Sequence, residues 1–165
     1  MEIRLPVGFD YALADQSIRR PVAHWQARGV SLNNGGTVPD HGDAAVLLPA
    51  GARGPAFLVF KNFRVIKRYN NATSYGMAVG HLGDRLVGGA PFVADWPRGD
   101  KPLSRTEKQE MQRLLTRLGF NTGGVDGIIG PNSRKAIRGF QRSRGLTPDG
   151  YASDVFLAQV RDAAG

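Results

Sequence analysis

The chain has 165 residues, of which 41% are hydrophobic and 22% charged, and it carries a net charge of +8. This apolar fraction is enough for packed cores and argues against disorder, and the length fits one ordinary domain or two small ones. The chain contains no cysteine, which excludes disulfides, thiolate zinc sites and cysteine nucleophiles. No apolar run approaches the roughly 20 residues of a membrane span. The opening residues MEIRLPVGFD lack the apolar core of a signal peptide, so we expect any export signal to lie off this chain.

The positive charge is spread evenly. Eleven Lys and Arg and seven Asp and Glu occur up to Gly99, and the same numbers follow it, so each half carries an excess of +4. Such a charge favours an anionic partner: nucleic acid, anionic lipid or a carboxylate-bearing polymer. The alternative is a soluble domain that is basic without a functional reason.

The first predicted elements are two strands and a short helix. Residues 1–55 are rich in Pro, Gly and Asp and show only weak periodicity. Two apolar runs, 44–48 and 56–60, are separated by glycines and a proline, which predicts a strand pair. Asn62 is then expected to cap a short helix. Its apolar face is predicted to carry Phe63, Ile66 and Tyr69.

A second helix is predicted from about Ser74 to Leu86, with a nearly bare stripe formed by Gly76, Gly80 and Gly83. Each interior glycine costs about 1 kcal/mol relative to alanine. We therefore expect another backbone or a ligand to approach this stripe closely, supplied by another chain or a missing domain. The stretch ADWPRGDKP (94–102) follows, and its two prolines, one glycine and four charges are typical of a linker.

A capping box, Ser104 to Glu107, begins the C-terminal part. The apolar residues of its helix recur at i, i+3, i+4 and i+7 and are Met111, Leu114, Leu115 and Leu118. Gly119 is expected to end this helix, with Phe120 packing beyond it.

Two further helices are predicted between aspartate–glycine turns. Asp126-Gly127 is a turn signal, and Gly130-Pro131 opens a helix because proline is pre-set for the first helical position. Gly145 closes that helix, whose buried face is Ala136, Ile137 and Phe140. Asp149-Gly150 repeats the turn, and Ser153 is expected to cap a third helix.

The order of these signals from Gly123 to Gly150, GGVDGIIGPNSRKAIRGFQRSRGLTPDG, resembles the peptidoglycan-binding domain 1 family of small three-helix cell-wall modules. The resemblance covers residues about 104–162 and implies a peptidoglycan ligand. The residues alone indicate only a compact helical domain.

A second resemblance covers residues about 1–98. Its motifs are LPxGFDY (5–11), LLPAGxxGPAFLV (47–59), NFxxIxRYNN (62–71) and SYxxAVGxLxDR (74–85). They are similar to the closing part of the catalytic domain of the lytic murein transglycosylase B family, whose members often carry a peptidoglycan-binding module next. The expected fold is α+β and mostly helical: a partial lysozyme-like segment (1–98), a linker (99–103) and a three-helix bundle (104–165).

The second resemblance implies chemistry through a single glutamate, which acts as acid and then as base to form a 1,6-anhydro product. Such a glutamate needs a raised pKa and therefore a desolvated cleft. The chain has three glutamates. Glu2 is expected to fray with the terminus, Glu107 belongs to the capping box, and Glu110 lies on the same first turns. In the family the catalytic glutamate lies upstream of the matched segment, so we expect no catalytic residue on this chain.

The predicted substrate-binding residues fall in both parts. By resemblance, Tyr69 and Asn70 line a sugar channel together with Asn71 and Tyr75. The alternative is that the asparagines only form a turn and the tyrosines fill core. In the C-terminal part the predicted contacts are Asp126, Arg138 and Gln141. For Asp126 and Gln141 the competing interpretation is turn and helix packing, and for the basic helix 131–144 it is a solvated face.

Other chemistry has little support. The three histidines show no metal-ligand spacing, no serine lies in a nucleophile-elbow motif, and the eleven aspartates are scattered, mostly in turns. We therefore expect no metal and no cofactor.

The predicted function is peptidoglycan binding, to glycan strands and stem peptides, within a transglycosylase-related protein of the periplasm or cell envelope. One alternative is an active lytic transglycosylase. Another is a basic nucleic-acid-binding protein, although no base-reading stripe is present and we expect no nucleic acid as partner.

Overall fold

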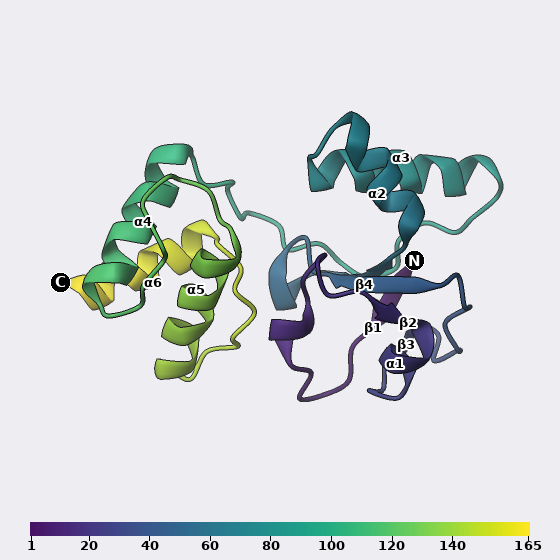
Figure 1. The fold of residues 1–165 in the computed structure, drawn as a ribbon, viewed down its shortest axis with the longest axis horizontal. Coiled ribbons are helices and arrows are strands. Elements are labelled where there is room, and N and C mark those ends of the chain that lie inside the picture. The colour runs from purple at the N-terminus through teal and green to yellow at the C-terminus, as the bar shows by residue number, and fades with distance from the viewer. The chain divides into compact units, whose positions relative to one another are not determined.

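The computed structural model describes residues 1–165 and divides them into two compact units, Met1–Trp96 and Pro97–Gly165. Each unit has its own hydrophobic core. Figure 1 shows that the sheet belongs to the first unit and that the second consists of helices. The expected fold class, α+β and mostly helical, is confirmed.

The first unit is built on an antiparallel sheet with the strand order β2-β4-β5-β1-β3. The predicted strand pair is confirmed as β4 and β5, with Ala45 opposite Val59 and Leu47 opposite Phe57. The strands are β1 (Glu2–Arg4), β2 (Arg20–Pro21), β3 (Ser31–Leu32), β4 (Asp43–Leu47) and β5 (Ala56–Val59).

Residues 1–55 are more ordered than their weak periodicity indicates. They hold β1, β2, β3, the helix α1 (Val22–Gln26) and two 3₁₀ turns, Tyr11–Leu13 and Gly51–Arg53. Elements of two to five residues contain too few residues to display a period. Long-range burial holds them instead: the Trp25 side chain is fully buried, and its Nε1 donates to the Ala44 carbonyl at 3.0 Å.

Helix α2 (Lys61–Tyr69) corrects two predictions. Phe60 occupies the N-cap position, so Asn62 is not the cap; its Oδ1 accepts from the neighbouring Phe63 N–H at 2.8 Å. Phe63 is buried, but Tyr69 is 87% exposed and does not share its face. At 100° per residue, six positions place Tyr69 about 120° around the helix from Phe63.

Helix α3 (Thr73–Leu86) carries the predicted glycine stripe and packs against α2. A Cβ at Gly76 would meet the Phe63 ring at 2.7 Å, and one at Gly80 would lie 4.0 Å from Ile66. Around Gly83 there is open space. The close approach expected at the stripe is therefore made by α2 of the same chain at Gly76, while Gly80 has only ordinary van der Waals contact with it.

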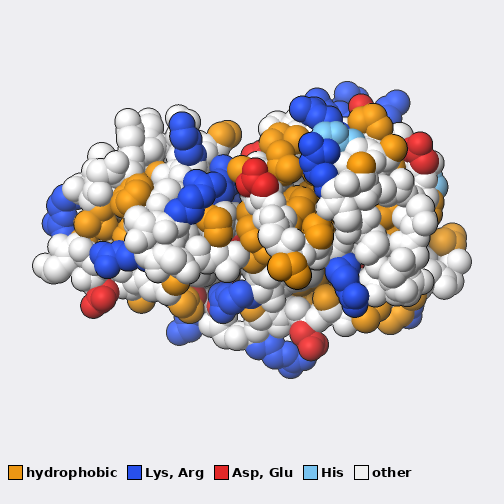
Figure 2. All heavy atoms as spheres, turned by 90° about the horizontal axis from the view of Figure 1, so that it is seen from below, with side chains coloured by type: hydrophobic (Ala, Val, Ile, Leu, Met, Phe, Trp, Pro, Cys, Tyr) orange, Lys and Arg blue, Asp and Glu red, His pale blue; other side chains and the backbone are white.

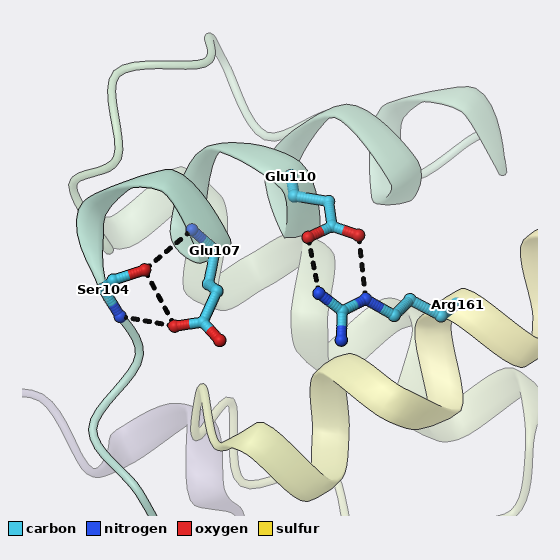
Figure 3. Close-up of polar contacts among 4 residues, drawn as sticks. All are labelled: Ser104, Glu107, Glu110 and Arg161. Atoms are coloured by element: carbon cyan, nitrogen blue, oxygen red, sulfur yellow. Dashed lines mark hydrogen bonds and ion pairs between the residues drawn. The ribbon is translucent and has the colours of Figure 1, made fainter.

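The second unit is a three-helix bundle of α4 (Arg105–Arg117), α5 (Pro131–Ser143) and α6 (Asp154–Ala164). Its core is formed by Met111, Leu115, Ile137, Phe140, Phe156, Leu157 and Val160. The capping box is confirmed, because the Glu107 N–H donates to Ser104 Oγ while the Glu107 carboxylate accepts from the Ser104 N–H (Figure 3). Ser153 caps α6 in the predicted way, accepting from the Phe156 N–H.

Candidate functional site

Two tyrosines form an exposed corner where α2 passes into α3. The Tyr69 and Tyr75 rings stack with centroids 5.9 Å apart and an interplanar angle of 29°. Tyr69 is exposed and Tyr75 half-buried, so neither fills the core as the alternative interpretation proposed. Stacked rings with an open face are suited to a pyranose, whose C–H groups lie flat on aromatic surface.

Asn70 and Asn71 lie in the same corner and are both exposed. The Asn70 Oδ1 accepts from the Ala72 N–H at 3.0 Å, the arrangement of an Asx turn that leads into α3. The Asn70 amide NH₂ keeps both of its donor hydrogens for a further partner. The turn role of Asn70 and a sugar-binding role are therefore compatible.

A cavity of about 390 Å³ lies between β5, α2 and α3, and none of the four corner residues lines it. Its lining is largely apolar and includes Phe57, Phe63, Met77 and Phe92. Asp84 is the only carboxylate that lines it. Since two-carboxylate glycoside hydrolysis needs a pair of acids facing one site, this cavity does not provide that arrangement.

The two glutamates of α4 are both stabilised in the charged form. Hydrogen bonds from the Ser104 backbone N–H and hydroxyl lower the pKa of Glu107. The Arg161 guanidinium binds the Glu110 carboxylate through Nε at 2.8 Å and Nη2 at 2.6 Å, and this pairing lowers the pKa of Glu110 (Figure 3). A glutamate that protonates a glycosidic oxygen needs a raised pKa, the opposite of both shifts.

Glu2 corrects the expectation of a fraying terminus. It lies in β1, which pairs with β5 on one side and β3 on the other. Its carboxylate accepts from the backbone N–H groups of Val93 (2.8 Å) and Ala94 (2.7 Å). Glu2 thus ties the segment after α3 back to the sheet.

The second unit contains the same glutamine clamp twice. In the first, Gln112 Nε2 donates to Asp126 Oδ1 at 3.0 Å, and Gln112 Oε1 accepts from the Gly127 N–H at 2.8 Å. In the second, Gln141 Nε2 donates to Asp149 Oδ1 at 2.7 Å, and Gln141 Oε1 accepts from the Gly150 N–H at 2.9 Å. Gly127 and Gly150 have φ of +76° and +71°, a conformation that favours glycine.

These clamps bear on two predicted ligand contacts. Gln141 is 6% exposed and both ends of its amide are engaged within the fold. The Asp126 carboxylate is exposed, but it accepts from Gln112 and from the Ile128 N–H, and these bonds lower its pKa. Both residues have the turn and packing roles that the sequence allowed as an alternative. Gln112, whose side chain is 1% exposed, was missed, because the turn it binds lies 14 residues away and leaves no local signal in the sequence.

A shallow groove of about 460 Å³ lies between α5 and the loop that follows α4. Its lining includes Phe120, Ala136 and Gly139, together with two cations of α5, Lys135 and Arg142. The predicted contacts Asp126, Arg138 and Gln141 do not line this groove. Arg138 instead runs beside the second clamp, where a Cβ on Gly150 would meet its Nη1 at 3.0 Å.

Positive charge is distributed over the surface of both units. Figure 2 shows Lys and Arg side chains scattered over the face in view, outnumbering Asp and Glu, without a single dense patch. The α5 sequence PNSRKAIRGFQRS contains four cations and no acid. No group of three or more His, Asp or Glu side chains is arranged to hold a metal ion. None of the helices has the length and apolar character of a membrane-crossing segment.

Comparison with known families identifies both units. The family model "Transglycosylase SLT domain" matches residues 1–84, which is half of the chain. The chain belongs to the SLT transglycosylase family. The model "Putative peptidoglycan binding domain" matches residues 104–160 of this SLT transglycosylase family member.

Solved structures agree with this assignment. Two crystal structures of SltB3 from Pseudomonas aeruginosa superpose with a TM-score of 0.92 and 51% sequence identity over 97% of this chain. One holds NAG-anhNAM-pentapeptide and the other NAG-NAM-pentapeptide. The match spans 44% of the SltB3 chain, so the greater part of that protein lies outside it.

Short matches to curated proteins also occur. The chain is 39% identical over 57 residues to "Putative OxPP cycle protein OpcA" of Synechocystis sp. and 39% identical over 56 residues to its namesake in Nostoc punctiforme. Each match covers 34% of this chain and 12% of the relative. These matches of 57 and 56 residues have the length of one small domain.

Proposed function

We propose that this chain binds peptidoglycan as part of a lytic murein transglycosylase and does not supply the catalytic acid itself. The observation that carries the proposal is the match to SltB3, whose structures hold peptidoglycan fragments, at 51% identity over 97% of the chain. The lowered pKa values of Glu107 and Glu110 support the proposal that this chain does not supply the catalytic acid. We infer from a substrate of this kind that the protein acts in the periplasm or cell envelope.

Each unit would meet a different part of the polymer. The Tyr69–Tyr75 corner offers ring surface to a sugar, and Asn70 and Asn71 offer amide groups to an N-acetyl substituent. In the second unit, Lys135 and Arg142 at the α5 groove would pair with the carboxylates of stem peptides. Arg138 stays a proposed contact beside the second clamp.

The central experiment is a pull-down with purified sacculi. We expect the full chain and residues 97–165 to sediment with sacculi, and residues 1–96 to do so much more weakly. Part of the binding should survive high salt, because exposed charges alone are screened within about 8 Å at 0.15 M. Equal sedimentation of both units, or of neither, would show the assignment to be wrong.

A matched pair of variants distinguishes the contribution of the groove to sacculus binding from the contribution of net charge. Arg142→Ala removes a cation that lines the groove, while Arg113→Ala removes an exposed cation of α4 outside it. We expect Arg142→Ala to weaken sacculus binding by roughly three- to tenfold, as for the loss of one charge-assisted contact. Arg113→Ala should leave it within a factor of about two. Equal losses would mean that net charge, and not the groove, supplies the affinity.

The catalytic alternative has a direct readout. If one of the three glutamates is a general acid, the chain alone should release 1,6-anhydro-muropeptides from sacculi. We expect none above buffer, with intact SltB3 as the positive control. Release by the chain that disappears in Glu110→Gln or Glu2→Gln would establish an active transglycosylase.

A further inference from the structure

The turn that follows β3 holds the one asparagine of the chain that precedes a glycine. Of the seven asparagines, only Asn34 has a glycine, Gly35, as its next residue. Gly35 donates its backbone N–H to the Leu32 carbonyl at 2.8 Å, and the Leu32 N–H donates to the Gly36 carbonyl at 2.9 Å. Asn34 and Gly35 are both exposed. We call residues 32–36 the Asn-Gly turn.

The Asn34 side chain is held against its own backbone. Its Oδ1 accepts from the Gly36 N–H at 2.9 Å, the arrangement of an Asx turn. This bond polarises the amide and makes its carbon, Cγ, a better target for a nucleophile. A donor aimed at Oδ1 also stabilises the negative charge that develops on that oxygen when a nucleophile adds to Cγ. The backbone nitrogen of Gly35 is such a nucleophile, because its bond to Cγ closes a succinimide ring.

Gly35 is suited to that attack because it has no side chain. Its φ is +81°, and there is open space where a Cβ would lie. A side chain at this position would stand beside the nitrogen and hinder its approach to Cγ, most of all if it were β-branched. The nitrogen must first release the Leu32 carbonyl. Exposed turns open locally at little cost in free energy, so this step does not require the unit to unfold.

Two further Asx turns in the chain allow a comparison. In each, the side-chain Oδ1 accepts from the backbone N–H two positions on, at 3.0 Å for Asn70 and 2.8 Å for Asn121. Both asparagines are exposed, as Asn34 is. Asn71 follows the first, and the β-branched Thr122 follows the second. The three turns therefore share one hydrogen bond and differ in the residue whose nitrogen would attack.

We propose that Asn34 is a site of spontaneous deamidation in the folded protein. Hydroxide removes the Gly35 backbone proton, and the nitrogen forms a bond to Asn34 Cγ. The Cγ–Nδ2 bond then breaks, and Nδ2 takes a proton from water and leaves as ammonia, which restores the hydroxide. Water opens the succinimide at either carbonyl and gives aspartate or isoaspartate, in which the backbone runs through Cγ. Water is consumed and ammonia is released, with no change of oxidation state.

The product changes both charge and geometry at the edge of the sheet. Asn34 lines a groove of about 620 Å³ together with Glu2 and Asp84, so a new carboxylate joins two acids there. Isoaspartate also lengthens the backbone of the Asn-Gly turn, which disturbs both of its hydrogen bonds. Since β3 is an edge strand that pairs with β1 alone, the isoaspartate form has a weakened edge.

The test incubates the folded full chain in mildly alkaline buffer and digests it with trypsin. Cleavage after Lys and Arg places the three asparagines in separate peptides, residues 29–53, 69–85 and 118–134. Isoaspartate is labelled with a protein isoaspartyl methyltransferase and located by peptide fragmentation, with an unincubated sample as the baseline. We expect it to form at Asn34 at least about tenfold faster than at Asn70 or Asn121, which corresponds to a barrier lower by about 1.4 kcal/mol. The converted chain should elute earlier from a cation exchanger.

A matched pair of variants tests the role of the following residue. Gly35 and Gly8 are both exposed, have φ of +81° and +78°, and have open space where a Cβ would lie. Gly35→Ala and Gly8→Ala should therefore strain the backbone to the same extent, which circular dichroism melts check. We expect Gly35→Ala to slow conversion at Asn34 about tenfold or more. Gly8→Ala should leave the rate unchanged.

Three results would overturn the inference. Equal rates at Asn34, Asn70 and Asn121 would mean that the glycine gives no advantage. Conversion of Asn34 in urea but not in the folded chain would show that the Asn-Gly turn protects its asparagine. An unchanged rate in Gly35→Ala would contradict attack by an unhindered nitrogen at position 35.

Discussion

At the residue scale, the buried glutamines fix the turns of the second unit. The Gln112 Nε2 atom lies within hydrogen-bond distance of Asp126 Oδ1, the Ile128 carbonyl and Ser133 Oγ, at 3.0, 3.0 and 3.1 Å, and its two hydrogens serve these acceptors. Its own carbonyl oxygen accepts from the Gly127 N–H. One side chain of α4 thus satisfies polar groups of the following loop and of the first turn of α5, and buried groups of this kind are costly to leave unpaired.

Gln112→Glu is expected to destabilise the unit by about 1–3 kcal/mol at pH 7, because a carboxylate cannot donate to these acceptors and would face Asp126. Gln159→Glu introduces the same charge at an exposed position of α6 and should have little effect. Urea denaturation of both variants measures the difference. Equal stabilities of the two variants would mean that the clamp contributes nothing. Lowering the pH should reduce the difference in unfolding free energy between the two variants, because the new carboxyl at position 112 becomes protonated.

At the element scale, α4 and α6 are joined by an ion pair on top of their shared core. Arg161 of α6 binds Glu110 of α4 through two parallel hydrogen bonds, with the side chains 50% and 33% exposed. Bidentate geometry favours such a pair, while solvent exposure limits its contribution. The helices themselves are held by the buried contacts of Met111, Leu115 and Val160.

The pH dependence of the second unit's stability follows from the direction of the pKa shifts of Glu107 and Glu110. The pKa of Glu110 is lowered in the fold by Arg161, and that of Glu107 by Ser104. Their stabilisation is therefore complete above the ordinary glutamate pKa of about 4.3 and is lost as the pH falls through the lowered values. Melting curves should show Glu110→Gln less stable than wild type at pH 7 and equal to it near pH 2. A difference that does not depend on pH would contradict this account.

At the scale of the whole molecule, the two units are expected to differ in stability. Residues 97–165 have a closed core, caps at α4 and α6 and two clamps, and domains of about 60 residues can fold alone. Residues 1–96 expose Val79, Leu82 and Leu86 of α3 and the tyrosine corner. We expect residues 97–165 to melt cooperatively alone, and residues 1–96 to melt at lower temperature. A non-cooperative melt of residues 97–165 would refute this, as would greater stability of residues 1–96.

The sequence by itself determined the elements that have local signals. The capping box at Ser104, the Asp126-Gly127 and Asp149-Gly150 turns, the Gly130-Pro131 helix start and the β4–β5 pair are each encoded within a few neighbouring residues, and the structure confirms them. The motifs of both parts likewise identified the two families. Ligand contact by the seven predicted residues stays a prediction; they are Tyr69, Asn70, Asn71, Tyr75, Asp126, Arg138 and Gln141.

Only the tertiary structure decided what depends on distant neighbours. It placed Glu2 against Val93 and Ala94, turned Tyr69 out to solvent, paired Gln141 with Asp149, and ordered the short strands of residues 1–55. Strands of two or three residues and a side chain that bonds a turn eight positions away have no periodic signal. Their order comes from burial and hydrogen bonds that form only when remote segments pack together.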